Sequence, residues 1–199
     1  MLVFMDTEFT GLHQNTTLIS LGLVDQDNRM FYAEFLDYDQ TQVDDWIVKN
    51  VLDHLIIDKI GTGLLDNPWK DATMIKDTKR KVVPLLNRWL SECKGSKLQL
   101  VSDVCHYDMM LFCELFGGAL SLGERISPYC HDLNGDLARH LGKTFAETFD
   151  ISREEFSKMK NEKLRHNALY DVIVIKRCWE RMYPPNQIHS KNHPMFTGW

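Results

Sequence analysis

The stretch L-V-F-M-D-T-E at residues 2–8 is an apolar run that ends in acids. An apolar run of this length, bounded by polar residues, predicts a buried β-strand over residues 2–7. Side chains alternate along a strand, so Asp6 and Glu8 point to the same face. Two adjacent carboxylates repel each other unless a cation lies between them, which makes the pair a candidate site for a hard metal ion. Acids also mark strand ends without such a role, so this short pattern does not decide the function by itself.

The segments that follow predict the rest of the fold. A second apolar run at residues 17–24 leads through a turn at residues 25–28 into an alternating segment, which predicts an antiparallel meander. Periodicity farther along predicts helices over residues 43–55, 71–92, 107–116, 132–141 and 167–183, with strands at residues 29–35, 98–101 and 128–130 and a loop at residues 56–69. This order predicts an α/β fold, a mixed β-sheet flanked by helices. We expect one domain over residues 1–183 and a tail at residues 184–199.

The composition is that of a globular protein, with 199 residues of which 44% are hydrophobic and 26% charged. No apolar run approaches the roughly 20 residues that span a bilayer, and the start lacks a basic leader, so we expect neither a membrane partner nor a signal peptide. The net charge of −5 argues against a simple cationic coat for nucleic acid, but not against an enzyme that meets phosphates through metal ions.

The five cysteines form no C-x-x-C pair and predict reduced thiols in a cytoplasmic protein. Cys105, His106 and Cys113 are a candidate zinc site, as an alternative to ordinary core cysteines.

Two further acids lie at predicted helix starts. Asp108 follows the strand at residues 98–101, and the helix dipole alone favours an acid there by roughly 0.3–1 kcal/mol. In H-N-A-L-Y-D, Asn167 is a good N-cap, which leaves His166 in the preceding loop and puts Asp171 in the second turn. His166 can then bend toward the site that Asp171 lines. Each feature alone has an ordinary structural explanation.

Taken together, these features resemble the DEDDh 3′→5′ exonucleases of the RNase H-like fold, the DnaQ-like superfamily that includes RNase T and oligoribonuclease. D-T-E-F-T-G-L at residues 6–12 is similar to the first motif and Tyr-Asp at residues 107–108 to the second. The H-x-x-x-x-D spacing of His166 and Asp171 is similar to the third. Within the superfamily, the chain most resembles the small exoribonucleases of the RNase AS type.

The resemblance implies a two-metal hydrolase. Asp6 would bridge two divalent ions. These ions would be Mg²⁺ or Mn²⁺, because the ligands are oxygen only. Glu8 and Asp171 would bind the first ion, and Asp108 would act on the second. His166 would take the proton from the attacking water. The products would be nucleoside 5′-monophosphates released from single-stranded 3′ ends, and the family likeness also implies a homodimer.

Four residues are expected to contact the substrate: Thr7, Phe9, Leu12 and His106. Phe9 and Leu12 are candidates for stacking on the terminal bases, each stack being worth about 1–3 kcal/mol, or are core residues instead. Phe9 replaces the Thr that is usual in the superfamily, and His106 is an unusual neighbour of the second acid. Basic residues within 76–81 and 158–165 are candidates for phosphate contacts or for solvated faces.

The sequence therefore predicts a metal-dependent 3′→5′ exoribonuclease acting on single-stranded RNA. One alternative is a 3′→5′ DNA exonuclease of the same superfamily, since a protein distinguishes the two nucleic acids by bonds to the 2′-hydroxyl. The other is a nucleic-acid-binding module that keeps the fold but is catalytically silent. The intact set of four acids and one histidine argues against that module.

Overall fold

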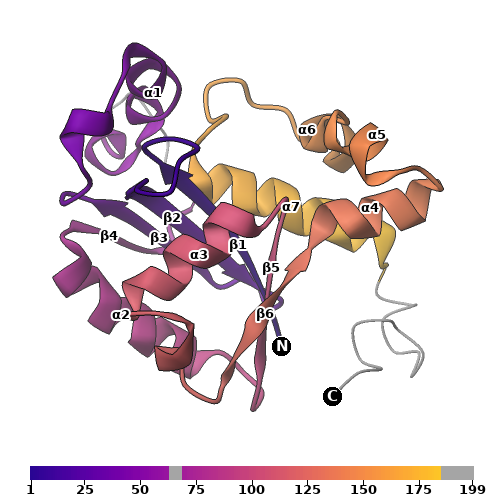
Figure 1. Ribbon diagram of the computed structural model, residues 1–199, viewed down its shortest axis with the longest axis horizontal. Helices are drawn as coiled ribbons and strands as arrows, with labels where there is room; N and C mark the ends of the chain where they lie inside the picture. Colours follow the sequence, from indigo (N-terminus) through magenta and orange to yellow (C-terminus); the bar gives the residue numbers. More distant parts are fainter. Residues whose placement is uncertain (63–68, 185–199) are drawn as a thin grey trace.

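A six-stranded mixed β-sheet forms the centre of the computed structural model, which describes residues 1–62 and 69–184 (Figure 1). The strands are β1 (Leu2–Phe9), β2 (Leu18–Asp25), β3 (Met30–Phe35), β4 (Thr73–Asp77), β5 (Leu98–Ser102) and β6 (Ile126–Asp132). Their order across the sheet is β4-β3-β2-β1-β5-β6. The first three strands form the expected antiparallel meander, and β4, β5 and β6 join in parallel. The predicted α/β fold with a mixed sheet is confirmed.

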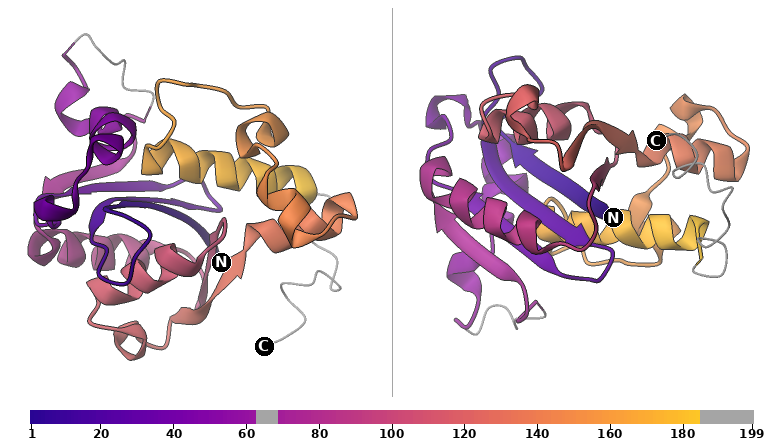
Figure 2. Two further views of the ribbon diagram at one scale, coloured as in Figure 1. Left: turned by 45° about the horizontal axis from the view of Figure 1, so that its top comes forward. Right: turned by 90° about the horizontal axis from the view of Figure 1, so that it is seen from below.

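Helices cover both faces of this sheet. They are α1 (Asp45–Asn50), α2 (Lys79–Glu92), α3 (His106–Leu115), α4 (Leu133–Leu141), α5 (Phe145–Phe149), α6 (Arg153–Ser157) and α7 (Ala168–Met182). None of the helices in the described part of the chain is long and apolar enough to span a membrane. The left view of Figure 2 shows α7 on one side of the sheet and α2 and α3 on the other.

Alternation along β1 decides on which side the acids lie. Val3 and Met5 enter the core that α2 and α3 cover, whereas Leu2 and Phe4 enter the core that α7 covers. Asp6 continues the series of Leu2 and Phe4, because residues two apart on a strand share a face. The carboxylates at the end of β1 therefore lie on the α7 side of the sheet.

Residues 71–92 do not form the single long helix that the sequence predicted. Thr73–Asp77 form the edge strand β4, which pairs with β3, and α2 begins only at Lys79. All five residues of β4 are half-buried, so the segment shows no alternation of buried and exposed positions that would indicate a strand. As a consequence, Lys76 lies on the sheet, where it forms an ion pair with Asp58, and is separated from the basic residues of α2.

The helix predicted over residues 43–55 is also shorter than expected. It consists of α1 and a separate 3₁₀ turn at Leu52–His54, because the backbone leaves the α-helical course at Val51 with φ −118° and ψ −59°. The four-residue apolar spacing is nevertheless used, since Ile47 and Val51 pack on Ile19 of β2. The short helix α1 and the 3₁₀ turn therefore bury the apolar side chains that one longer helix was expected to bury.

The short helices α5 and α6 lie in a region where the sequence predicted no element. Each begins at a side-chain cap, Thr144 for α5 and Ser152 for α6. Five residues are too few for a visible helical period, so only these caps signal the helices. Residues 63–68 of the expected loop and residues 185–199 of the expected tail lie outside the described residues.

Candidate active site

A cavity of about 460 Å³ lies where the end of β1 meets the start of α7. Asp6 and Glu8 line it from β1, and His166 and Asp171 line it from the loop before α7 and from α7 itself. Residues 149–154 contribute another wall. The groups of the first and third sequence motifs thus converge on one hollow.

Gly22 lets α7 approach the sheet closely enough to form this cavity. Gly22 lies on β2 directly opposite Asp6 of β1. A Cβ atom on residue 22 would lie 2.2 Å from the backbone carbonyl oxygen of Ala168, which is closer than real atoms approach. A residue without a side chain is therefore required where the first turn of α7 crosses β2, and this close crossing carries Asp171 to the acids of β1.

Gly22→Ala should lower both stability and activity, because the contact is with backbone atoms that cannot rotate away. Overpacking of this kind typically costs about 1–3 kcal/mol, and the shift of α7 would also displace Asp171. Urea unfolding and RNA hydrolysis measure the two effects. Gly135→Ala on α4 is the matched control, since its Cβ would meet only side-chain atoms, of Phe145 at 3.3 Å and of Arg139 at 3.8 Å, and alanine favours a helix. Equal losses in the two variants would contradict this explanation.

Asn167 fixes the position at which α7 begins. It is fully buried, and its Oδ1 accepts hydrogen bonds from the backbone N–H groups of Leu169 and Tyr170. Its Nδ2 donates to the hydroxyl of Tyr32 and to the carbonyl of His54, both at 3.0 Å. The predicted N-cap is therefore also an anchor to β3 and to the turn after α1, which fixes the residues on either side of it.

The backbone of His166, in the loop before α7, adopts the left-handed conformation with φ +60°, which non-glycine residues rarely adopt. The edge of its half-buried ring meets Trp46, with the ring centroids 5.7 Å apart. One ring nitrogen and one carboxylate oxygen each from Glu8 and Asp171 all lie within 4.8 Å of one another. Burial lowers the pKa of His166 and the charge of Arg165 lowers it further, which favours the neutral, proton-accepting ring.

Asp108 lies beside this cavity without lining it. The carboxylate is buried, and its Oδ1 accepts hydrogen bonds from the backbone N–H of Thr7 at 3.1 Å and from the Thr7 hydroxyl at 2.5 Å. Its Oδ2 accepts a hydrogen bond from the hydroxyl of Ser102 at 2.5 Å. Thr7, one of the expected substrate contacts, is therefore buried and engaged with Asp108.

Burial raises the pKa values of all four acids. Burial contributes most at Asp6 and Glu8, and the charges of neighbouring carboxylates add to it. Burial likewise raises the pKa of Asp108 to about 6 and that of Asp171 to about 7. Oxygen ligands in such an unfavourable cluster are the donor set that hard divalent cations stabilise. The residues therefore fit a site for such cations.

The other expected substrate contacts lie in different surroundings. Phe9 is half-buried and stacks on Tyr107, with ring centroids 5.2 Å apart and an interplanar angle of 18°. Leu12, on the loop after β1, is 79% exposed. His106 is exposed at the first position of α3. Leu12 and His106 are thus accessible to a substrate, whereas one face of the Phe9 ring is already covered by Tyr107.

Asp103 and Arg153 are two charged residues of the site that sequence reasoning missed. Both line the cavity, and they form an ion pair with Nε and Oδ2 2.8 Å apart. The available signal was that Asp103 follows the strand predicted at residues 98–101, much as Asp6 follows the apolar run of β1. The segment around Trp46 also looks like that of the RNase AS-type enzymes, but the contact of Trp46 with His166 was not predicted.

The zinc alternative is not supported by the geometry. All five cysteines are free thiols. Within residues 1–62 and 69–184, the only close group of three metal-ligating side chains is the one formed by Glu8, His166 and Asp171. Cys105, His106 and Cys113 are not brought together.

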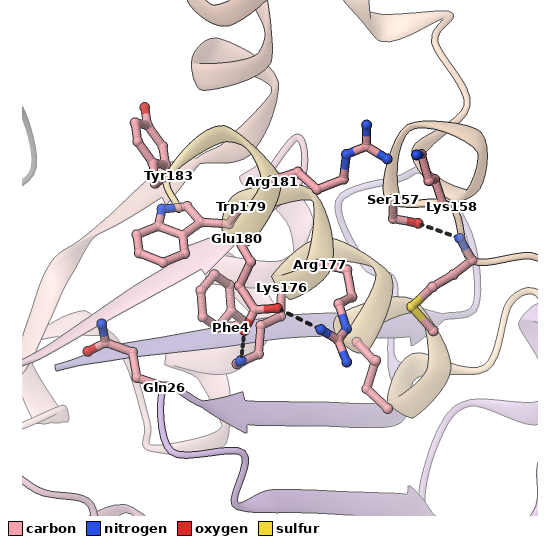
Figure 3. A pocket seen from close by; sticks show the side chains of 12 residues that line it. Phe4, Gln26, Ser157, Lys158, Lys176, Arg177, Trp179, Glu180, Arg181 and Tyr183 are labelled. Atoms are coloured by element: carbon pink, nitrogen blue, oxygen red, sulfur yellow. Dashed lines mark hydrogen bonds and ion pairs between the residues drawn. The ribbon is translucent and has the colours of Figure 1, made fainter. Parts of the chain in front are cut away.

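A larger cavity of about 1030 Å³ lies against the C-terminal half of α7 (Figure 3). Its lining combines aromatic rings with basic side chains: Phe4, Trp179, Tyr183, Lys158, Lys176, Arg177 and Arg181. Glu180 binds both Lys176 and Arg177 there. None of the four acids or His166 lines this cavity. Convergence of reactive groups, and not size, therefore identifies the candidate active site.

Known proteins resemble the chain in sequence and in fold. No protein-family model matches it. A 3′-5′ exoribonuclease of Mycobacterium tuberculosis is 24% identical over 133 residues, which are 67% of this chain and 71% of the relative. A full-length 3′-exonuclease superposes with a TM-score of 0.57 at 17% identity, over 91% of this chain and 80% of that chain. The nuclease domain of 3′hExo, a DEDDh family member bound to rAMP, gives 0.56 at 16% identity, over 91% and 90%.

The chain therefore has the RNase H-like fold that these 3′-exonucleases share, which confirms the fold that the motif resemblance implied. Of the residues that the motif resemblance predicted for the site, four line the cavity, Asp6, Glu8, His166 and Asp171, and Asp108 lies beside it. The roles of the individual residues are the subject of the proposal that follows.

Proposed function

We propose that this protein is a metal-dependent 3′→5′ exoribonuclease that releases nucleoside 5′-monophosphates from single-stranded 3′ ends. The convergence of Asp6, Glu8, His166 and Asp171 on one cavity is the observation that carries the proposal. It is supported by the Mycobacterium tuberculosis relative, which is named a 3′-5′ exoribonuclease, and by the neighbour that binds rAMP.

In this proposal the acids attract and hold the cations, and the histidine moves the proton. Asp6, Glu8 and Asp171 would hold two divalent ions, Mg²⁺ or Mn²⁺, with Asp108 contributing its charge from beside the cavity. Such ions, when bound, make a water more acidic and stabilise the leaving 3′ oxygen. Neutral His166 accepts the proton of the attacking water. The left-handed backbone and the Trp46 contact hold its ring for this task.

Single-stranded RNA with a labelled 5′ end tests the activity directly. We expect a ladder that shortens from the 3′ end, with 5′-monophosphate products, in the presence of Mg²⁺ or Mn²⁺ and not in EDTA. Internal cleavage would contradict the exonuclease. Binding without hydrolysis in Mn²⁺ would favour the catalytically silent module.

RNA should be degraded faster than DNA of the same sequence. Glu8 and the backbone of residues 7–11 are candidates to bond the 2′-hydroxyl of the terminal sugar, whereas His106 lies outside the lining of this cavity. One hydrogen bond to a charged group contributes about 1.5–3 kcal/mol, equivalent to roughly 10- to 150-fold. Equal or faster kcat/KM on the matched deoxy strand would favour the DNA exonuclease instead.

We further propose that the protein is a cytoplasmic homodimer built from one domain over residues 1–183. Support comes from the resemblance to small exoribonucleases and, for the reducing compartment, from the free thiols. The apolar tail residues Met195, Phe196 and Trp199, expected to contribute to a dimer, lie outside the described residues. A monomeric mass by light scattering at micromolar concentration would reject the dimer.

A further inference from the structure

Asp103 is a further acid that lines the cavity with Asp6 and Glu8. β1 and β5 are parallel neighbours, so Asp6 and Asp103, which follows Ser102, lie at the same end of these two strands. Burial raises the pKa of Asp6 most, and the charge of Asp103 adds to the shift. A carboxylate at this position therefore acts electrostatically on the proposed metal ligands.

Arg153, the first residue of α6, binds Asp103 through a two-pronged contact. Nε donates to Oδ2 at 2.8 Å and Nη2 donates to Oδ1 at 3.0 Å. Nη2 also donates to Oδ1 of Asn134 at 2.8 Å, and Nη1 donates to the carbonyls of Thr148 and Ile151 at 2.7 Å each. All five N–H groups of the guanidinium are thus used, and 12% of the side chain is exposed. Arg153 is therefore held in place and has no donor left for a substrate phosphate.

Without this partner, Asp103 would be a competing ligand for the catalytic cations, because carboxylate oxygens are what hard divalent ions prefer. We propose that Arg153 is a positioning residue that occupies both oxygens of Asp103 and so keeps this acid away from the cations. The cations are then left to Asp6, Glu8 and Asp171. This inference rests on the proposed function and concerns the composition of its metal site.

Arg153 also ties one wall of the cavity to the sheet, and this second effect must be separated from the first. Phe149 and Asp150 line the cavity between the two carbonyl groups that Arg153 binds. Neutralising Arg153 alone removes the brace and frees the carboxylate. Neutralising Asp103 together with Arg153 also removes the brace but leaves no free carboxylate, so the two roles predict different results for the double variant.

The test compares Arg153→Gln, Asp103→Asn and the double variant with the wild type. Calorimetric titration with Mn²⁺ in the absence of RNA reports the cation sites, and kcat and KM on single-stranded RNA report the reaction. For Arg153→Gln we expect an additional or tighter Mn²⁺ site and a kcat lower by about 10- to 100-fold, the usual cost of losing a partner in a metal site. KM should change less.

The double variant should recover. Asparagine at position 103 offers the cations no carboxylate, so the competing ligand is gone although the brace is lost as well. We expect the wild-type Mn²⁺ stoichiometry and a kcat within about threefold of the wild type, a non-additive result that only interacting residues give.

Two outcomes would overturn the proposal. If the double variant is as slow as Arg153→Gln and both give the wild-type Mn²⁺ isotherm, Arg153 serves only as a brace. If Asp103→Asn and the double variant both lose Mn²⁺ binding, Asp103 is itself a ligand. The isotherms need no hydrolysis, so failure of the exoribonuclease function would appear as absent RNA cleavage with the expected order of isotherms retained.

Arg153→Lys keeps the proposal falsifiable should Arg153→Gln fail to fold. Lysine keeps the positive charge beside Asp103 but lacks the planar fork that binds several acceptors at once. We expect the wild-type Mn²⁺ stoichiometry and a kcat within about fivefold of the wild type despite a lower Tm. A kcat that falls in step with the Tm would leave only the bracing role and overturn the proposal.

Discussion

Asp6→Asn should abolish RNA hydrolysis while making the metal-free protein more stable. Burial, and then the charges of Asp108 and Asp171, raise the folded-state pKa of Asp6 well above its ordinary value of 3.8. When the pKa of a carboxyl is higher in the folded than in the unfolded state, the folded state loses stability as the pH rises past the unfolded-state pKa. Ionised Asp6 therefore destabilises the metal-free fold at neutral pH. Asparagine removes that charge together with the ligand that the cations need.

Labelled RNA measures the loss of activity, and thermal unfolding in EDTA measures the gain in Tm. Asp39→Asn is the control, because Asp39 is only half-buried and the Thr41 hydroxyl and backbone N–H lower its pKa, the opposite direction. That variant should keep full activity and gain no stability. Activity of Asp6→Asn near that of the wild type, wild-type activity in EDTA, or a lower Tm for metal-free Asp6→Asn would contradict the assignment.

His166→Ala should reduce kcat by roughly 10²–10⁴-fold, the usual contribution of a general base. Burial already lowers the pKa of His166, so the neutral ring is ready to accept a proton, and alanine has no group to replace it. Calorimetry with Mn²⁺ should show that cation binding persists, since the carboxylates of Glu8 and Asp171 are retained. Single-turnover kinetics on RNA measure the chemical step.

The control for this variant is His140→Ala. His140 lies on α4, where its exposed ring meets Phe156, and it does not line the cavity. Its replacement should leave the rate unchanged. A loss below about threefold in His166→Ala would mean that another group removes the proton.

The fold could be predicted from the sequence where local signals agree. In α7, an apolar stripe follows the N-cap Asn167, and Pro184 lies just beyond the end of the helix. The prediction of this helix, of its start and of its end was therefore correct. Residues 73–77 gave no such agreement, because what makes them a strand is their pairing with β3, some forty residues earlier. Pairing of this kind is a property of the assembled sheet and leaves little trace in the segment itself.

The sequence motifs could predict that Asp6, Glu8, His166 and Asp171 come together at one cavity, but they could not predict the hydrogen bonds of the neighbouring acids. Asp108 depends on Thr7, 101 positions away, and Asp103 depends on Arg153, 50 positions away. Such pairs form only when β1, β5 and α6 meet. The sequence motifs indicated the groups proposed to carry the chemistry, whereas the residues that hold the neighbouring acids in place emerge from the tertiary structure.

The candidate active site joins segments from near the two ends of the described chain, since Asp6 and His166 are 160 positions apart. During synthesis the N-terminal part emerges first, at about 5–20 residues per second. A nascent chain that has reached residue 160 already contains all six strands, but it lacks both the proposed base and the acid of the third motif. The sheet is therefore synthesised before the residues that complete the candidate site. The cavity forms only when α7 docks on Gly22, so the last helix to be made closes the site.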